Sequence, residues 1–302
     1  MPTDIYQRIT DQIVAQLAQG ARPWLRPWSS GHMAGRMSLP RRHNGVAYRG
    51  VNIITLWMRA LEQGYAAPTW MTFKQALDLG ACVRKGEKGS PVVYADTITR
   101  TERDAESGED NAQNIHFMRA YTVFNVEQID GLPAHYHVKP APAAPAAPAL
   151  PRIERAERFF AATGAVIRHG GSRAYYAPGP DHIQMPPFEA FRDAESYYAT
   201  LAYEGIHWTL HPSRLARSFD AKRSGDEGYA MEELVAELGS AFLCADLALT
   251  PELRDDHASY LDDWLKVLQG DKRAIFTAAA HAQRAADFLH GCRPDKGVTA
   301  AA

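Results

Sequence analysis

Few cysteines and the absence of any long hydrophobic run exclude two kinds of protein. The three cysteines, Cys82, Cys244 and Cys292, are odd in number and far apart in the 302-residue chain. They provide neither a disulfide framework nor a C-x-x-C metal knuckle, and we interpret them as small buried hydrophobic residues. No apolar run approaches the length of a membrane span, and the N-terminal MPTDIYQRITDQ has acidic residues where a signal peptide needs an apolar core. We therefore expect a cytoplasmic protein that has no membrane partner.

The net charge of −2 conceals an uneven distribution along the chain. Residues 1–95 contain twelve Lys and Arg against five acidic residues, so this part carries +7 and the remainder −9. A basic half joined to an acidic half predicts that the first half contacts a polyanion. The length is sufficient for two domains of ordinary size.

A Pro/Ala run divides the sequence. Residues 139–151, KPAPAAPAAPALP, have almost no side chains that could bury a core and favour an extended, semi-rigid linker. We therefore predict one domain at 1–138 and a second at 152–302. A polar run at 101–114 lies between two strand-like segments and is typical of a mobile hairpin tip.

Hydrophobic periodicity predicts an α+β first domain and a mainly helical second domain with one β-hairpin. In the first domain we expect helices over residues 4–19, 51–63 and 72–79, followed by the two strands. In the second we expect helices over residues 152–163, 189–201, the segment around MEELVAEL, 256–268 and 271–290, with the hairpin formed by AVIRHGG and RAYYAPGPDHIQMP.

In the segment 22–49, arginines alternate with the aromatic residues Trp24, Trp28 and Tyr48. Bases of a single strand can stack on aromatic side chains while arginines neutralise phosphates, whereas duplex DNA hides its base faces. A second basic group, RKGEKG at 84–89, has glycines that permit a close backbone approach to phosphates. The candidate DNA contacts are Arg22, Trp24, Arg26, Trp28, Arg41, Arg42, Tyr48, Arg49, Arg84, Lys85 and Lys88. The alternative is that the tryptophans are partly buried between prolines and that RKGEKG is a solvated turn.

The segment YEGIHWTLH nearly contains a helical zinc-protease motif. In H-E-x-x-H, two imidazoles one turn apart bind the metal and the Glu acts as general base. Here Tyr203 occupies the position of the first His, while Glu204 and His207 lie three apart on one helix face. We expect His211 one turn further along that face.

The helix that begins MEELVAEL offers further carboxylates, Glu232, Glu233 and Glu237. Glu233 and Glu237 share a helix face, so the pair could supply one ligand and one acceptor that orients a ligand's imidazole. The alternative is that these glutamates are solvated charges on an amphipathic helix. Imidazole ligands favour Zn²⁺ or Mn²⁺, so we expect one such divalent ion.

Several motifs together resemble a known family. The N-terminal half, with PWLRPW, YRGVNIITLW, TWMTFKQALDLGACVRKGEKGSPVVY and FMRAYTVFNVEQIDGLP, resembles the single-stranded-DNA-binding domain of ArdC-type antirestriction proteins of conjugative plasmids. The second half resembles their zincin-type metallopeptidase domain through YEGIHWTLHPSRLAR and YAMEELVAELGSAFL. The resemblance extends from about residue 4 to residue 290 and predicts a zincin-like fold for the second domain.

This resemblance implies a protein that protects incoming single-stranded plasmid DNA from restriction in the recipient cell. It also implies a metal site in which His207 is the motif's second histidine, Glu204 the general base and Glu233 the downstream acidic ligand. Tyr203 departs from the pattern, which leaves three options: Tyr203 binds as phenolate, His211 replaces the missing imidazole, or the metal is weakly bound and the peptidase is inactive.

Three functions remain to be compared. An active peptidase would have a host restriction-system protein as its target. A rival hypothesis keeps DNA binding and treats the second domain as a scaffold without activity. A metal-dependent nuclease is disfavoured because such sites usually cluster oxygen ligands around Mg²⁺.

Overall fold

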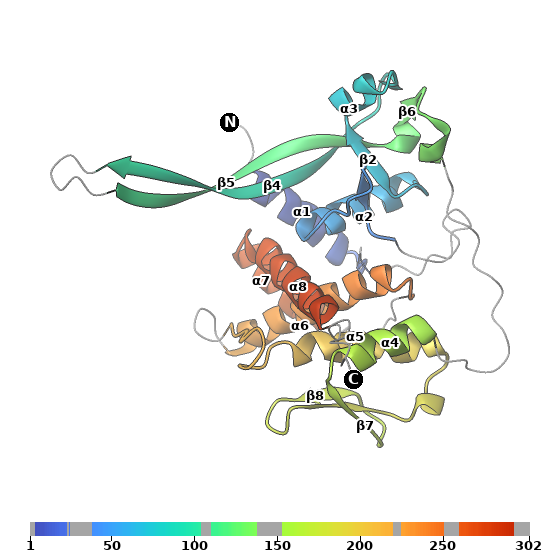
Figure 1. Ribbon diagram of the computed structural model, residues 1–302, viewed down its shortest axis with the longest axis vertical. Coiled ribbons are helices and arrows are strands. Elements are labelled where there is room, and N and C mark those ends of the chain that lie inside the picture. The colour runs from blue at the N-terminus through green and yellow to red at the C-terminus, as the bar shows by residue number, and fades with distance from the viewer. Residues whose placement is uncertain are drawn as a thin grey trace, which may run out of the picture. The chain divides into compact units, whose positions relative to one another are not determined.

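The computed structural model describes residues 4–22, 24, 38–103, 110–137, 153–219, 225–250 and 260–292, with residues 97–103, 110–117, 137 and 225 described by their backbone alone. Contacts divide the chain into two compact units. Unit 1 comprises residues 1–39, 48–66 and 140–302, and unit 2 comprises residues 40–47 and 67–139. Both units contain helices and strands (Figure 1). This mixture confirms the predicted α+β class.

Two helices from the N-terminal part belong to unit 1. Helix α1, Ile5–Leu17, begins where the Asp4 carboxylate accepts a hydrogen bond from the Tyr6 amide and buries one apolar stripe. Helix α2, Val51–Gln63, has the predicted bounds and ends at Gly64, whose φ of 72° suits a helix C-terminus. The Thr10 hydroxyl donates to the Lys272 carbonyl, which connects α1 to the turn between the last two helices of the chain that the structure describes.

The compact units therefore cut across the order of the sequence motifs. The domains 1–138 and 152–302 stay a prediction. Unit 1 is defined by contacts, and it joins α1 and α2 to segments of the C-terminal half. The Pro/Ala segment 139–151 lies outside the described residues.

The rest of unit 1 consists of helices around a small sheet. The elements are α4 (Glu154–Ala162), β7 (Val166–His169), β8 (Tyr175–Ala177), β9 (His182–Met185), α5 (Ala194–Trp208), α6 (Gly225–Asp246), α7 (Leu261–Gly270) and α8 (Ala274–Gly291). The strand order is β7-β9-β8, with β7 parallel to β9 and β8 antiparallel to it. The predicted single hairpin is therefore wrong in one respect: β8 and β9 form the hairpin, and β7 joins β9 in parallel.

Helix α5 lies in the core of unit 1. Thirteen of its fifteen residues are buried, which is typical of a helix surrounded by other elements. Gly239 of α6 lets the two helices approach closely, because a Cβ there would lie 2.8 Å from the Ile206 side chain of α5. Alanines along α8 are also fully buried and permit close helix packing. The site motif is thus carried by rigid, tightly packed helices.

Unit 2 is built on a four-stranded sheet. Its elements are β1 (Arg41–Arg42), β2 (Thr69–Thr72), α3 (Phe73–Asp78), β3 (Cys82–Val83), β4 (Ser90–Arg103), β5 (Asp110–Asn125) and β6 (Ile129–Asp130), with sheet order β1-β2-β5-β4 and a separate β3-β6 pair. Met71, Val126 and Ile129 are central to its core. The β4–β5 ladder continues to the pair Arg103–Asp110, so the predicted long hairpin forms and residues 101–103 and 110–114 of the polar run are strand. Residues 104–109 lie outside the described residues.

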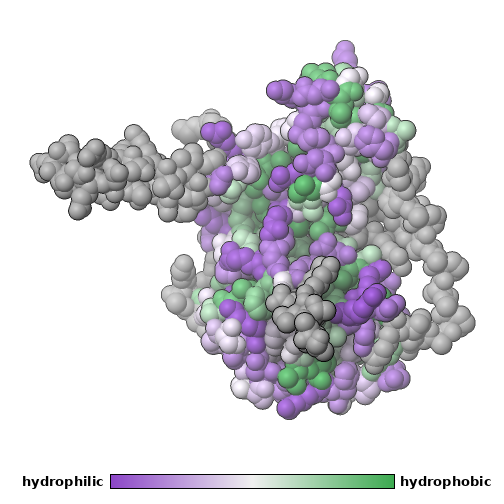
Figure 2. Space-filling view, viewed as in Figure 1, coloured by the Kyte–Doolittle hydropathy of each residue, from purple (hydrophilic) through white to green (hydrophobic). Residues whose placement is uncertain are grey.

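On the face shown in Figure 2, hydrophilic and hydrophobic residues are interspersed. Among the residues that the structure describes, no helix is both long and apolar enough to span a membrane. Cys244 is buried as predicted, but Cys82 is exposed and Cys292 is half-buried, so the interpretation of all three as core residues is wrong.

Candidate functional site

Helix α5 brings three residues of the altered motif to one place. The helix begins where the Asp193 carboxylate accepts a 2.7 Å hydrogen bond from the Ser196 amide. Tyr203 and Glu204 are then buried with 5% and 3% exposure, and the His207 side chain is 12% exposed. Residues three and four apart lie on one helix face, and this face is directed toward α6.

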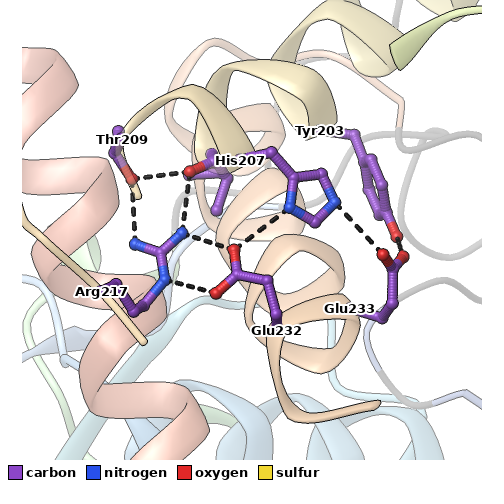
Figure 3. Close-up of polar contacts among 7 residues, drawn as sticks. Tyr203, His207, Thr209, Arg217, Glu232 and Glu233 are labelled. Carbon is purple, nitrogen blue, oxygen red and sulfur yellow. Dashed lines mark hydrogen bonds and ion pairs between the residues drawn. The ribbon is translucent and has the colours of Figure 1, made fainter. Parts of the chain in front are cut away.

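The His207 imidazole lies between two glutamates of α6 (Figure 3). Its Nδ1 is 3.1 Å from the Oε1 of Glu232, and its Nε2 is 3.6 Å from the Oε1 of Glu233. The Tyr203 hydroxyl donates to the other oxygen of Glu233. The Tyr203 phenol, the His207 Nε2 and the Glu233 carboxylate, all predicted ligands, therefore converge on one place.

Glu232 is held in turn by a buried arginine. Arg217 donates to both Glu232 oxygens at 2.7 Å, and its remaining donors contact the Thr209 hydroxyl and the Ile206 carbonyl at 3.0 Å each. Such a bidentate pair fixes the carboxylate in position as well as neutralising it. Sequence reasoning missed this role: Arg217 follows the motif in a loop, where no periodicity links it to Glu232.

The site's charges are coupled. Burial alone would raise the pKa of Glu232, but the hydrogen bonds from Arg217 and His207 outweigh burial and lower it. Burial alone would lower the pKa of His207, but the hydrogen bond and negative charge of Glu232 outweigh burial and raise it. An ionised Glu232 at Nδ1 is the type of outer partner that usually orients a metal-binding imidazole, leaving Nε2 for the ion.

The cluster opens into a cavity of about 340 Å³. Its lining includes Arg173, Tyr175, Tyr176, Tyr203, Glu204, His207, Tyr229, Glu232, Glu233 and Tyr260. Glu204 therefore shares a cavity with His207, as a general base of this motif would. Partial burial and the hydrogen bond with Tyr260 raise the pKa of Tyr229, so its hydroxyl stays protonated. Tyr229 and Tyr260 are site residues that the sequence did not indicate.

Two residues expected near the site lie elsewhere. Helix α5 ends at Trp208, and His211 lies in the following turn with its Nδ1 2.8 Å from the Ser213 hydroxyl. The prediction that His211 continues the helix face is therefore wrong. Glu237 is buried and accepts hydrogen bonds from Arg22 and Trp24 at 3.3 Å each, so Glu232, and not Glu237, orients the imidazole.

The donor set fits one transition-metal ion if the phenol takes part. No group of three His, Cys, Asp or Glu side chains within the described ranges is arranged to hold a metal. The cluster provides two such ligands, the His207 nitrogen and the Glu233 carboxylate, and the Tyr203 hydroxyl is the third donor beside them. Imidazole and carboxylate ligands suit zinc and manganese, and a hydrolytic site usually has three protein ligands.

Several predicted DNA contacts are core residues. The Trp24 indole has no exposed surface, packs against Trp264 and donates to Glu237. Arg22 and Tyr48 are 8% and 7% exposed. The role predicted for these three residues is wrong, because the enclosed rings offer no face to a base and the Arg22 guanidinium is paired with Glu237. Arg26 and Trp28 lie outside the described residues.

The other predicted contacts are accessible. Arg41, Arg42, Lys85 and Lys88 are exposed in unit 2. Arg84 is exposed as well, but it pairs with Glu87 at 2.9 Å and with Asp130 at 3.4 Å. Arg49, in unit 1, is exposed and forms an ion pair with Asp287. The exposed predicted contacts of unit 2 thus lie in β1 and in the β3–β4 loop.

An altered H-E-x-x-H helix facing an acidic helix, beside a small sheet, defines the class of zincin-like metallopeptidase domains, and residues 154–281 match the zincin-like metallopeptidase family. Residues 3–124 match the N-terminal domain of anti-restriction factor ArdC. The chain belongs to the ArdC antirestriction family.

Similar proteins extend over nearly the whole chain. Crystal structures of antirestriction protein ArdC from plasmid R388 match with a TM-score of 0.79: the metal-free form is 46% identical and covers 96% of this chain and 97% of that chain, and the Mn(II)-bound form is 44% identical and covers 97% and 100%. The uncharacterized protein y4eC of Sinorhizobium fredii is 47% identical over 97% of this chain and 94% of its own length. DNA primase TraC of Escherichia coli is 39% identical over 94% of this chain, but the match spans 27% of that primase.

Proposed function

We propose that this protein binds single-stranded DNA, holds one divalent metal ion in a metallopeptidase-like site, and protects incoming conjugative DNA from host restriction. Membership of the ArdC family over both halves of the chain is the observation that carries the proposal. The exposed basic residues of unit 2 support the DNA-binding part, because phosphate neutralisation dominates the affinity of such proteins.

His207, Glu233 and Tyr203 would hold the ion. An ion bound there would lower the pKa of a coordinated water and polarise a substrate carbonyl. Glu232 orients the His207 ring through Nδ1, and Glu204 lies in the same cavity, where it can accept a proton. The protonated Tyr229 hydroxyl can donate a hydrogen bond into the cavity. In this reading the substrate is a protein of the host restriction system.

The second candidate function is a DNA-binding protein whose C-terminal part is a scaffold. The hydrogen bond from Tyr203 to Glu233 favours it, because each group satisfies the other without a metal. The metal content of wild type, Tyr203→His, His207→Ala and His211→Ala, purified without chelator, tests the site. The proposal expects loss of the ion in His207→Ala, a higher content in Tyr203→His and no change in His211→Ala. Unchanged metal content in His207→Ala would exclude the site.

Conjugation into restricting and non-restricting recipients tests the biological role. Because α1 and α2 belong to unit 1, point variants are preferable to deletion of the N-terminal half. One variant replaces Arg41, Arg42, Lys85 and Lys88 with Gln, and the other is Glu204→Ala. The proposal expects the first variant to lose protection and DNA affinity together. Protection that survives in Glu204→Ala would favour the scaffold, and its loss with intact DNA binding would favour hydrolysis.

Single-stranded DNA binding is tested by fluorescence anisotropy with matched single-stranded and duplex oligonucleotides over a range of salt concentrations. We expect tighter binding of the single strand and an affinity that falls steeply with salt, because counterions are released from the phosphates. Equal affinity for both forms would contradict the single-strand preference.

A further inference from the structure

A group of exposed aromatic and basic side chains lies on one face of the unit 2 sheet. In the β4–β5 ladder, Val92 pairs with Tyr121 and Tyr94 pairs with Arg119. Directly paired residues point to the same side of a sheet, as do residues two apart along one strand. Tyr94, Tyr121 and Arg119 therefore share one face of the ribbon.

The register extends this face to the edge strand β1. Arg42 pairs with Trp70 of β2, Trp70 pairs with Asn125 of β5, and Asn125 lies four residues from Tyr121 on the same strand. Arg42 is consequently on the same face as the two tyrosines. We call Arg42, Tyr94, Arg119 and Tyr121 the tyrosine face. All four residues belong to unit 2.

The tyrosines of this face are accessible, unlike Trp24 and Tyr48. Tyr94 is 44% exposed and Tyr121 is 45% exposed, whereas Trp24 is fully buried. Toward the base of the ribbon the same face is closed, since Val92 and Val123 are 6% and 2% exposed. The two rings are diagonal neighbours, at about 7–8 Å between positions on the two strands, so both can contact one extended ligand.

The charge of the tyrosine face suits a polyanion with planar groups. Arg42 and Arg119 are both exposed. The Tyr94 hydroxyl donates to Asp96 at 2.6 Å, and this bond raises the pKa of Tyr94, while the positive charge of Arg42 acts in the opposite direction. Asp96 lies two residues beyond Tyr94, on the same side of β4. Exposed aromatic rings beside arginines are what a single strand requires, with bases stacked and phosphates neutralised.

We infer that the tyrosine face is the surface on which bases of single-stranded DNA stack, with Arg42 and Arg119 contacting the phosphates. The inference rests on the proposed DNA-binding function and assigns it to residues other than Trp24, Trp28 and Tyr48. The ordered core of unit 2 places the rings on paired strands, so the stacking positions exist before the DNA binds.

The full-length protein with Tyr94→Ala, Tyr121→Ala and the double variant tests this assignment. Binding of a short fluorescein-labelled oligo(dT) is measured by anisotropy, with circular dichroism to verify folding. Loss of one stacked base should weaken binding by about 5- to 150-fold per tyrosine. Tyr94→Phe and Tyr121→Phe should bind like wild type, because phenylalanine retains the ring.

The control is Phe73→Ala. Phe73 is also a half-exposed aromatic of unit 2 (48%), and it contacts Phe124, which points to the opposite side of β5 from Tyr121. We expect wild-type affinity from this variant. Wild-type affinity in the Tyr94→Ala, Tyr121→Ala double variant would overturn the inference while leaving the proposed function intact. The same result together with lost protection in conjugation would mark the face as a protein-docking surface, which also overturns it. No binding by the wild-type protein would refute both.

Discussion

Hydrogen bonds join Arg217 to Glu232 and Glu232 to His207, so we expect Arg217→Met to lower both the stability of the protein and its affinity for the metal. The Arg217 side chain is 1% exposed and gives four hydrogen bonds, two of them to Glu232. Removing one partner of a buried ion pair costs about 3–5 kcal/mol. Because Glu232 keeps 15% exposure and its contact with His207, we expect the free energy of unfolding to fall by about 3 kcal/mol, the lower end of that range.

The same change should weaken metal binding through His207. With Arg217 absent, Glu232 is free to rotate away from Nδ1, and the imidazole loses its fixed orientation. Loss of an outer partner of a metal ligand typically costs 10- to 100-fold in affinity, which corresponds to about 1.4–2.7 kcal/mol. Glu232→Gln should have a similar effect on affinity, because a neutral amide accepts a weaker hydrogen bond. The Arg217→Met, Glu232→Gln double variant should lose less stability than the two single effects together, because both act on one pair.

Two measurements separate the effects. Urea unfolding in the presence of chelator gives the metal-free stability, and competition with a chelating dye gives the Mn(II) affinity. Arg158→Met is the matched control, since Arg158 is 72% exposed and its contact with Glu154 is 3.5 Å long, and exposed pairs contribute about 0–1 kcal/mol. Wild-type Mn(II) affinity in a folded Arg217→Met protein would refute the idea that Glu232 orients the imidazole.

Three further outcomes follow from the packing. Trp24→Ala should cost about 3–5 kcal/mol in unfolding experiments, as a buried aromatic does, and leave the single-stranded DNA affinity of the folded protein unchanged. Gly239→Ala should destabilise by about 1–3 kcal/mol despite the better helix propensity of alanine, because its Cβ would overlap Ile206; a more stable variant in urea would contradict the close packing. The pKa of Asp181 is lowered to about 2, chiefly by its hydrogen bonds from Arg214. This stabilisation is fully present above the unfolded carboxyl pKa near 3.9 and is lost as pH falls toward 2, so Asp181→Asn should flatten the acid end of the stability–pH profile.

Local patterns predicted the helices well, because their causes lie within a few residues. The apolar spacing of α1 and the glycine after α2 are visible in the sequence, and both helices form where expected. The spacing of Glu204 and His207 likewise follows from one helical turn. The pairing of β7 with β9 could not be predicted from spacing, because a parallel pair depends on contacts across an intervening strand and turn.

The sequence contains a local sign that His211 lies outside the helix, which the i, i+4 spacing of His207 and His211 does not show. Pro212 follows it directly, and the residue before a proline is disfavoured in helical conformation. The chain accordingly leaves the helix after Trp208. Trp24 had no such signal. Its burial depends on Trp264 and Glu237, more than two hundred residues away, and the composition of RPWLRPW suits a DNA-contacting segment and a core segment equally.

Helix α6 makes the metal site and the N-terminal segment parts of one structure. Glu232 and Glu233 face the His207 cluster, and one turn later the buried Glu237 accepts hydrogen bonds from Arg22 and Trp24. All of these residues lie in unit 1. Removal of the residues that precede the Pro/Ala run would therefore remove Arg22, the cation that pairs with the Glu237 carboxylate. That carboxylate is 1% exposed, and losing one partner of such a buried pair costs about 3–5 kcal/mol. Loss of activity in a truncated protein would then report damage to α6, so the contribution of DNA binding can be measured only with surface variants of the full-length chain.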